Sequence, residues 1–346
     1  MDTIDLRSDT VTKPTPEMRE VMAKAEVGDD VYGEDPTVNR LQALAAEMTG
    51  QEAGLFVASG TMGNLAAVLA HCQRGDEVIL GKKAHTFLYE AGGISVLGGV
   101  HSNQLTNQAD GSIALDEIEE AIRWNDAHEP VTRLIALENT HNRCGGTYQS
   151  VEYTHQVTEF AHERGLKVHL DGARVFNAAA ALGVPARELT GTVDSVTFCL
   201  SKGLSAPVGS VLCGPQDFIK QAHRIRKMLG GGMRQAGVLA AAGIVALEKM
   251  VPRLGDDHVR ARTLAEGLSE NRSLVLDPGT SATNMVFMNL GDEVPLSAAE
   301  VAEKMKQQSV LVGVTGTRRF RLVLHSWIND EGVEQAVTAF RDVLVN

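Results

Sequence analysis

The sequence predicts an α/β protein with a mostly parallel, doubly wound sheet, followed by a smaller C-terminal α+β domain. Three observations lead to this fold class. Short apolar runs alternate with helical segments through residues 54–214. The runs are apolar almost throughout, as in strands that are buried on both faces. A glycine-rich turn, Ser59-Gly60-Thr61-Met62-Gly63-Asn64, joins one such run to a helix.

The elements follow one another with short connections. An arm containing LRSDTV, Pro14 and Pro16 leads into an amphipathic helix that ends near Glu26, and VGDDVYGEDP (27–36) has the composition of a loop. The next expected helices cover 37–48, 65–73, 115–123, 151–164 and 175–182. The expected strands cover 54–58, 77–80, 94–97, 133–137, 166–170, 195–200 and 210–214.

The pattern changes in the last third of the chain. A helical tract runs from Gln216 to about Met250 and is interrupted at Gly230–Gly232, where the backbone beside Lys227 and Arg234 could hold an anion or form a hinge. We then expect a helix, a strand, a helix, a hairpin around Gly316 and a final helix, with the regular elements at 257–268, 284–290, 298–308 and 330–344. These features predict an arm and large domain in 1–250 and a small domain in 251–346.

Composition narrows the function classes. With 346 residues, 43% hydrophobic and 22% charged, the chain is typical of a soluble globular protein. Its net charge of -12 argues against nucleic-acid or anionic-membrane partners. No apolar run reaches the ~18 residues of a membrane span, and MDTIDLRSDT lacks the features of a signal peptide, so we expect a cytoplasmic protein.

The four cysteines do not form a framework. Cys72, Cys144, Cys199 and Cys213 are scattered, with no CxxC pair. This spacing predicts buried free thiols, with no zinc site and no disulfides. We expect no metal in the functional site.

Polar residues follow several of the predicted strands. Because ligands of open α/β sheets bind at the carboxyl ends of strands, these positions are the candidate site. They are Gly60-Thr61, Glu138-Asn139-Thr140-His141-Asn142, Asp171-Gly172-Ala173-Arg174 and Lys202.

Lys202 stands at the end of a buried strand, within TFCLSKGLSAPVG, and small residues follow it. Partial desolvation at such a place lowers the pKa of an ammonium and favours the nucleophilic amine of Schiff-base chemistry. A lone lysine there is also typical of a solvated strand end. Its neighbours therefore decide between the two interpretations.

The neighbours match the needs of pyridoxal phosphate. That cofactor requires a lysine for its aldehyde, a carboxylate for its pyridine nitrogen, a ring against its face and helix-start donors for its phosphate. Lys202, Asp171, His85 and the turn at Gly60-Thr61 are candidates for these roles.

The chain resembles the low-specificity L-threonine aldolases, including L-allo-threonine aldolases, among the fold-type I pyridoxal-phosphate enzymes of aspartate-aminotransferase-like fold. The resemblance runs from about Asp5 to the end of the chain. It is carried, in order, by LRSDTVT, EVGDDVYGEDPTVN, SGTMGNL, LENTHN, HLDGARVFNA, LSKGLSAPVGS and RKMLGGGMRQAG.

The resemblance implies the cofactor contacts. Lys202 would bind pyridoxal 5'-phosphate as a Schiff base, Asp171 would pair with the pyridine nitrogen, and Arg174 would reach the ring hydroxyl and the substrate. Gly60 and Thr61 would hold the phosphate, and His85 would stack on the ring.

It also implies the substrate contacts. His141 would lie near the substrate side chain, while Ser8 and Arg321 would bind the substrate carboxylate. Alternation in a strand separates Arg321 from the apolar face of Phe320 and Leu322, and a guanidinium suits a carboxylate. Arg318 or Arg319 would be equal candidates if this arginine merely faced solvent.

The resemblance further implies a homodimer or homotetramer with active sites at the subunit interface, where Tyr32, Lys227 and Arg234 extend toward a neighbouring site. The implied reaction is reversible retro-aldol cleavage of a β-hydroxy-α-amino acid to glycine and an aldehyde, with His85, His141 or a water as the base. A β-eliminating lyase or an aminotransferase of the same fold would share Lys202 and Asp171.

Overall fold

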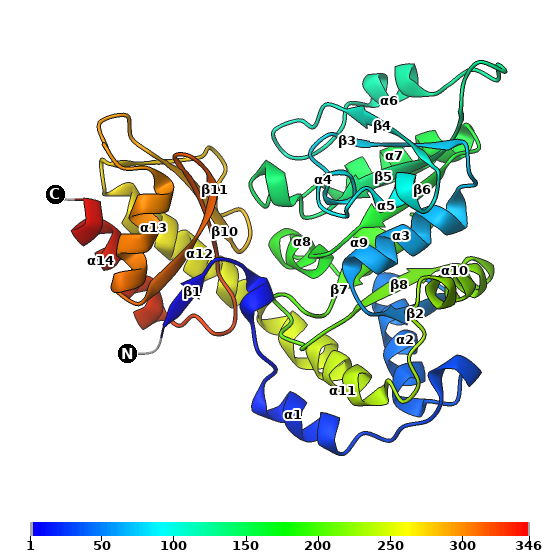
Figure 1. The fold of residues 1–346 in the computed structure, drawn as a ribbon, viewed down its shortest axis with the longest axis horizontal. Coiled ribbons are helices and arrows are strands. Elements are labelled where there is room, and N and C mark those ends of the chain that lie inside the picture. The colour runs from blue at the N-terminus through cyan, green and yellow to red at the C-terminus, as the bar shows by residue number, and fades with distance from the viewer. Residues whose placement is uncertain (1–2, 345–346) are drawn as a thin grey trace.

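Two β-sheets organise the protein in the computed structural model, which describes residues 3–344 (Figure 1). The larger sheet has seven strands in the order β2-β8-β7-β6-β5-β3-β4. Only β8 runs antiparallel to its neighbours, so the predicted mostly parallel sheet is confirmed. The strands are β2 (Ala53–Val57), β3 (Asp76–Gly81), β4 (His101–Leu105), β5 (Val131–Glu138), β6 (Lys167–Asp171), β7 (Ser195–Cys199) and β8 (Ser210–Gly214).

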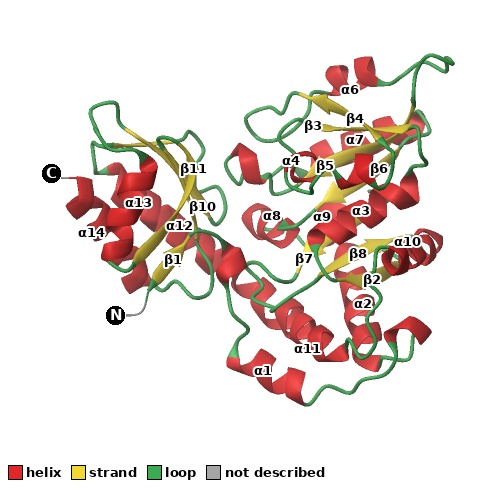
Figure 2. Cartoon of the chain, in the orientation of Figure 1, coloured by secondary structure: helices red, strands yellow, loops and turns green. Residues whose placement is uncertain are grey.

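The larger sheet is covered on both faces, because successive side chains of a strand point to opposite sides. In β2, Leu55 and Val57 pack with α3 (Gly60–His71) and α10 (Gln216–Met228), whereas Phe56 packs into the core on the other face. The helices contributing to that other core include α2 (Pro36–Thr49), α7 (Val151–Glu163), α8 (Val175–Leu182), α9 (Ala186–Thr190) and α11 (Gly237–Val245). Figure 2 shows the resulting layers of helix, sheet and helix.

One predicted strand is wrong. Residues 94–97 were expected to be extended, but Gly93–Val96 form the short helix α5, and the edge strand is β4, a few residues further on. A four-residue apolar run does not distinguish a strand from a helix. The sequence of β4, HSNQL, is polar because an edge strand is largely exposed, so it carries no apolar signal.

The smaller sheet has five strands in the order β1-β11-β12-β10-β9. The expected hairpin around Gly316 joins β11 to β12. The strands are β1 (Ile4–Leu6), β9 (Leu274–Leu276), β10 (Met285–Leu290), β11 (Val310–Gly316) and β12 (Arg319–Val323), and the helices that pack with them are α12 (Leu254–Ser269), α13 (Ala298–Gln307) and α14 (Asp330–Leu344). Their apolar side chains form a separate core.

The N-terminal arm crosses between the two sheets. Strand β1 pairs in parallel with β11, so residues 4–6 belong to the smaller sheet rather than to the large unit in which the arm was expected. Ile4 and Leu6 are buried in the smaller core, but a three-residue strand is too short for its alternation to be recognised. A domain boundary near residue 251 stays a prediction.

Three further helices, α1 (Pro16–Ala23), α4 (His85–Leu88) and α6 (Leu115–Ala121), belong to the larger unit. Two of them, α1 and α6, contribute the buried Met18 and Ile118 to its core. The glycines at 230–232 lie between α10 and α11 and interrupt the helical tract as expected. Among residues 3–344, no helix combines the length and the apolar character that crossing a membrane requires.

Candidate active site

Asp171 is the centre of a buried polar cluster at the carboxyl end of β6. Its Oδ2 accepts a hydrogen bond from Asn64 Nδ2 at 2.9 Å, and its Oδ1 accepts one from the backbone N–H of Ala173 at 3.2 Å. Asn64 Nδ2 also donates to Glu90 Oε1 at 2.8 Å, and His85 Nδ1 lies 2.9 Å from the same oxygen. The nearest ligand-type atoms of His85, Glu90 and Asp171 lie within 4.8 Å of one another.

The charges in this cluster influence one another. Burial and the neighbouring charge of Asp171 raise the pKa of Glu90, although its hydrogen bond with His85 opposes the shift. In turn, the hydrogen bond to Glu90 raises the pKa of His85, aided by the charge of Asp171 and opposed by burial and by the charge of Lys202. His85 is therefore a base strengthened by its carboxylate partner.

Glu138 joins two loops of the site. It is the last residue of β5, and its carboxylate accepts hydrogen bonds from the backbone N–H of His85 at 2.7 Å and of Asn142 at 2.9 Å. The side chain is only 5% exposed. The predicted site loops that begin at His85 and His141 are thereby held against the same strand end.

His141 is more deeply buried than His85. Its side chain is 1% exposed, its Nε2 lies 3.2 Å from Asn107 Nδ2, and its Nδ1 lies 3.9 Å from Glu138 Oε1 without a hydrogen bond. Gly111 leaves room for the ring, because a Cβ at that glycine would come within 2.5 Å of the His141 Cβ. In the described chain, this ring is covered by protein.

Arg174 pairs with a carboxylate from the N-terminal arm. Its Nε and Nη2 each donate to the Asp9 carboxylate at 2.6 Å, and both residues are buried. Burial alone would raise the pKa of Asp9, but the charge and hydrogen bonds of Arg174, together with the charge of Lys202, hold it far below its usual range. Thr12 Oγ1 donates to the Lys202 carbonyl at 2.9 Å, so the arm also holds the Lys202 loop.

Arg321 lies on the polar face of β12, as the alternation predicted. Its Nη1 donates to Asn142 Oδ1 at 2.8 Å and its Nη2 to the Arg7 carbonyl at 3.2 Å, whereas its Nε is buried without a partner. Burial, together with the charge of Arg174, lowers its pKa. The guanidinium thus retains a free donor beside the predicted site.

The alternative arginines are engaged elsewhere. Arg319 pairs with Asp277, and Arg318 donates to the carbonyls of Gly291 and Val294. Arg321 is the candidate that the structure favours. Ser8, the other predicted carboxylate ligand, caps a short 3-10 turn: its Oγ accepts from the backbone N–H of Thr10 at 3.2 Å.

The start of α3 has the strand, glycine turn and helix geometry on which the predicted phosphate site depends. Ser59 caps the helix by accepting a hydrogen bond from the Met62 N–H at 3.2 Å, and Gly60 and Thr61 occupy the first helical turn, whose N–H groups lack intrahelical partners. A Cβ at Gly60 would lie 2.9 Å from Cys199 Sγ, and one at Gly63 would lie 2.5 Å from Thr197 Cγ2. The glycines therefore bring this helix start close to β7.

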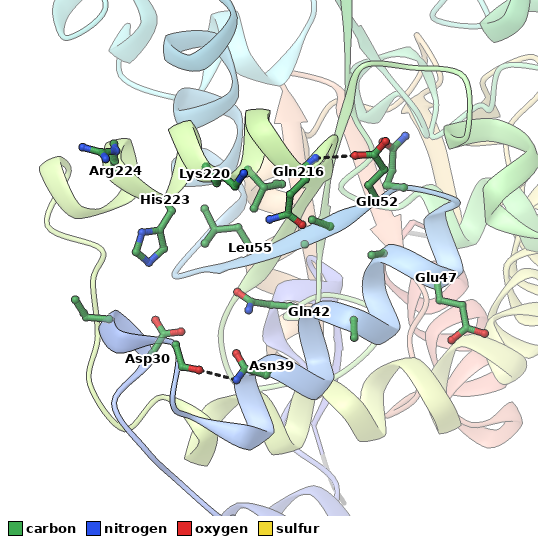
Figure 3. A pocket seen from close by; sticks show the side chains of 18 of the residues that line it. Asp30, Asn39, Gln42, Glu47, Glu52, Leu55, Gln216, Lys220, His223 and Arg224 are labelled. Carbon is green, nitrogen blue, oxygen red and sulfur yellow. Dashed lines mark hydrogen bonds between the residues drawn. The ribbon is translucent and has the colours of Figure 1, made fainter.

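Tyr32, Lys227 and Arg234 form a second group around the 29–33 loop. Tyr32 is 76% exposed, and Arg234 Nη1 pairs with Asp29 Oδ2 at 3.0 Å. Tyr32 also lines a cavity of about 910 Å³ between the 30–33 turn, α2, β2 and α10 (Figure 3). The residues that line this cavity do not include Lys202, Asp171 or His85, so the cavity beside Tyr32 is not formed by the Asp171 cluster.

Three residues of the site, Asn64, Glu90 and Asp9, were not singled out from the sequence, whereas Glu138 was among the predicted strand-end positions. Asn64 and Glu90 lie within or beside the motifs, but a single sequence does not distinguish a site carboxylate or amide from a surface one. Asp9 follows Ser8 in LRSD, and its partner is 165 residues away. The sequence around either residue does not indicate an ion pair between segments so far apart in the chain.

The arrangement fits pyridoxal phosphate. Pyridoxal phosphate uses a carboxylate, a helix start for its phosphate, a ring against its face and an amine. Groups of these kinds are present here in the buried Asp171, the glycine turn at the start of α3, the His85 ring and the Lys202 side chain. The fold and the site together define a pyridoxal-phosphate enzyme of fold type I.

Similarity to known proteins narrows the class. Residues 5–290 match the family model described as beta-eliminating lyase. The chain is 49% identical to low-specificity L-threonine aldolase 1 of Arabidopsis thaliana over 100% of this chain and 97% of the relative. It is 48% identical to the low specificity L-threonine aldolase of Escherichia coli strain K12 over 99% of both chains. The protein belongs to the family of low-specificity L-threonine aldolases.

A solved structure shares the fold. The threonine aldolase of Leishmania major superposes with a TM-score of 0.83 over 99% of both chains, at 20% sequence identity. This likeness confirms the architecture of both sheets and the layers around them.

Proposed function

We propose that the protein cleaves L-threonine, L-allo-threonine and related β-hydroxy-α-amino acids to glycine and an aldehyde, which is acetaldehyde for threonine, in a reversible pyridoxal-phosphate-dependent reaction. The observation that carries this proposal is the meeting of Asp171 and His85 at one sheet edge, with Arg321 reaching toward the adjoining loop through Asn142. The similarity to low-specificity L-threonine aldolases along the whole chain supports the same reaction.

The proposed roles follow the positions of the side chains. When bound, pyridoxal phosphate withdraws electrons from a bond at the substrate α-carbon. Lys202 holds the cofactor through its amine, and Asp171 pairs with the pyridine nitrogen. Gly60 and Thr61 bind the phosphate through the free N–H groups of the first turn of α3.

Substrate orientation is assigned to the polar face of β12 and the arm. Arg321 binds the substrate carboxylate through its free donor, with Ser8 beside it, and this contact selects the bond between Cα and Cβ for cleavage. Arg174 stays paired with Asp9 and presents its positive charge to the same region.

We assign the base to His85. It accepts the proton of the β-hydroxyl as the bond from Cα to Cβ breaks and the aldehyde leaves, and the α-carbon then takes up a proton to give glycine. His85 has a side chain that is 33% exposed and a carboxylate partner, whereas the His141 ring is 1% exposed. His141 lines the space for the substrate side chain.

The second group of residues supports an oligomer. Tyr32 is highly exposed and lines a cavity that the Asp171 cluster does not form. In the proposed homodimer or homotetramer, the site of a neighbouring subunit is completed by Tyr32, Lys227 and Arg234. The four cysteines are buried free thiols, which are typical of a reducing compartment and support a cytoplasmic location.

The direct test is product analysis. The purified holoenzyme, incubated with L-threonine or L-allo-threonine, should release glycine and acetaldehyde in equal amounts. A β-eliminating lyase would instead form 2-oxobutanoate and ammonia, and an aminotransferase would require an oxo-acid acceptor. Formation of 2-oxobutanoate, or a reaction that proceeds only with an added oxo acid, would contradict the aldolase proposal if no acetaldehyde is released.

The substitution Glu90→Gln tests the choice of base. Because the hydrogen bond that His85 donates to the Glu90 carboxylate raises the pKa of His85, loss of that carboxylate should lower the pKa. The neutral imidazole then persists to lower pH, so the acid limb of the kcat/KM profile should move to lower pH. The profile is measured from acetaldehyde release. An unmoved acid limb in Glu90→Gln would assign the base to another group.

A further inference from the structure

A buried chain of hydrogen bonds leads away from Asp171, on the side of the sheet covered by α3. Asn64 Oδ1 lies 3.1 Å from His169 Nε2, and His169 Nδ1 lies 2.8 Å from Ser195 Oγ. Ser195 Oγ lies 2.8 Å from His71 Nε2 as well. The chain therefore runs through four side chains, from His71 to Asn64, and ends at two carboxylates, Asp171 and Glu90.

The secondary structure places these residues in two rows. Asn64 and His71 are seven residues apart on α3 and share one face of that helix. His169 precedes Asp171 by two residues on β6, so both side chains point to the same face of the sheet. Ser195 is the first residue of β7, next to β6. The polar row is enclosed between helix and sheet: Asn64, His169 and Ser195 are at most 1% exposed.

Only one direction of hydrogen bonding satisfies every link. The Asn64 Nδ2 group faces two carboxylate oxygens, so it donates to both, and Oδ1 is left as an acceptor. His169 must then donate from Nε2, and as a neutral ring it accepts at Nδ1. Ser195 consequently donates its hydroxyl proton to His169 and accepts from His71.

The imidazoles are suited to this neutral arrangement. Burial lowers the pKa of His169 to about 3 and that of His71 to about 4, so each ring has a single N–H near neutral pH. The His71 ring also stacks on Phe218 at 4.4 Å between ring centroids, which fixes its plane. Each donor in the chain points toward the carboxylates.

We propose that Asn64 is the positioning residue for Asp171, and that His169, oriented by Ser195 and His71, fixes the Asn64 amide so that both of its N–H bonds face Asp171 and Glu90. A flipped amide would place its oxygen against two carboxylates and would remove a donor from the oxygen of Asp171. Asn64 therefore sets the position of the carboxylate that receives the pyridine nitrogen. This inference rests on the proposed role of Asp171.

Two substitutions of His169 separate positioning from stability. His169→Gln keeps a donor near the place of Nε2, facing Asn64, but loses the acceptor for Ser195. His169→Asn keeps an acceptor near the place of Nδ1, facing Ser195, but loses the donor to Asn64. Each variant removes one buried hydrogen bond, so a purely structural role predicts similar losses of thermal stability and of cofactor affinity in the two.

The experiment measures the dissociation constant of pyridoxal phosphate for each apoenzyme and the visible circular dichroism of the reconstituted holoenzyme, with thermal unfolding of each variant as the stability measure. We expect His169→Asn to bind the cofactor about tenfold more weakly than the wild type, as for the loss of one hydrogen bond to a charged group, and to show an altered dichroic band. His169→Gln should stay within about twofold of the wild type, which is the scale of an indirect effect.

The outcomes distinguish this inference from the proposed function. Equal losses of cofactor affinity in His169→Asn and His169→Gln would overturn the positioning role. The proposed function would still stand in that case, provided that the wild type binds the cofactor. A wild-type protein without affinity for pyridoxal phosphate would instead overturn the proposed function. If His169→Asn fails to fold, Asn64→Ser replaces it, and cofactor affinity equal to that of the wild type would contradict the inference.

Discussion

Replacing Lys202 with alanine is expected to abolish covalent cofactor attachment and to lower the rate of acetaldehyde release by at least about a thousandfold. The loop of Lys202 is held by Thr12 from the arm, and the charge of its side chain influences both Asp9 and His85. The positive charge of Lys202 therefore acts on both groups from the same region of the site. The visible absorption of the bound cofactor and the initial rate with L-threonine measure the two effects.

Lys167 provides the matched control for this substitution. It begins β6, at the end of the sheet opposite Asp171, and its exposed side chain pairs with Asp194. Lys167→Ala should leave the absorption band and the rate within about twofold of the wild type, because an exposed ion pair contributes little. A Lys202→Ala enzyme that kept its absorption band and its rate would refute the assignment of the covalent lysine.

The site residues that could be predicted from the sequence are those whose position follows from the pattern of a single strand. Asp171 and Lys202 follow apolar strands, and parallel strands bring their carboxyl ends to one edge of the sheet. Arg321 was separated from the apolar face of β12 by alternation within the strand, and the structure places Phe320 and Leu322 in the smaller core. In each case a short window of sequence contains the physical cause.

The parts that were not predicted depend on contacts between distant segments. The polar edge strand β4 lacks an apolar pattern, and β1 is held by its pairing with β11 across more than 300 residues. Asn64 acquires its importance only when α3 packs against β6, because His169 and Asp171 then face it. Tertiary packing selects which polar side chains are buried, and the sequence of each segment does not contain that information.

Removal of the Asp9 side chain is expected to cost more stability than any exposed ion pair in the protein. Asp9→Ala would leave the buried guanidinium of Arg174 without its bidentate partner, with the charges of Lys202 and Arg321 nearby. An uncompensated buried charge lowers the free energy of unfolding by about 3–5 kcal/mol. Urea unfolding of the variant measures the loss.

Asp5 is the control within the same arm. It pairs with Arg7, whose side chain is 53% exposed, so Asp5→Ala should cost only about 1 kcal/mol or less. The double variant Asp9→Ala/Arg174→Met removes both buried charges and should be more stable than Asp9→Ala alone. Equal stability of Asp9→Ala and Asp5→Ala would show that the buried pair does not hold the arm.

The contribution of Asp9 should also depend on pH in a defined direction. Its folded-state pKa lies far below the value of about 3.9 for an unfolded aspartate, so its contribution is fully present above that pH and is lost as pH falls toward the folded-state pKa. The difference in unfolding free energy between the wild type and Asp9→Ala should therefore be constant near neutral pH and narrow below about pH 4. Because Arg174 remains charged throughout this range, the narrowing reports protonation of Asp9, and a difference that widened in acid would contradict the pairing.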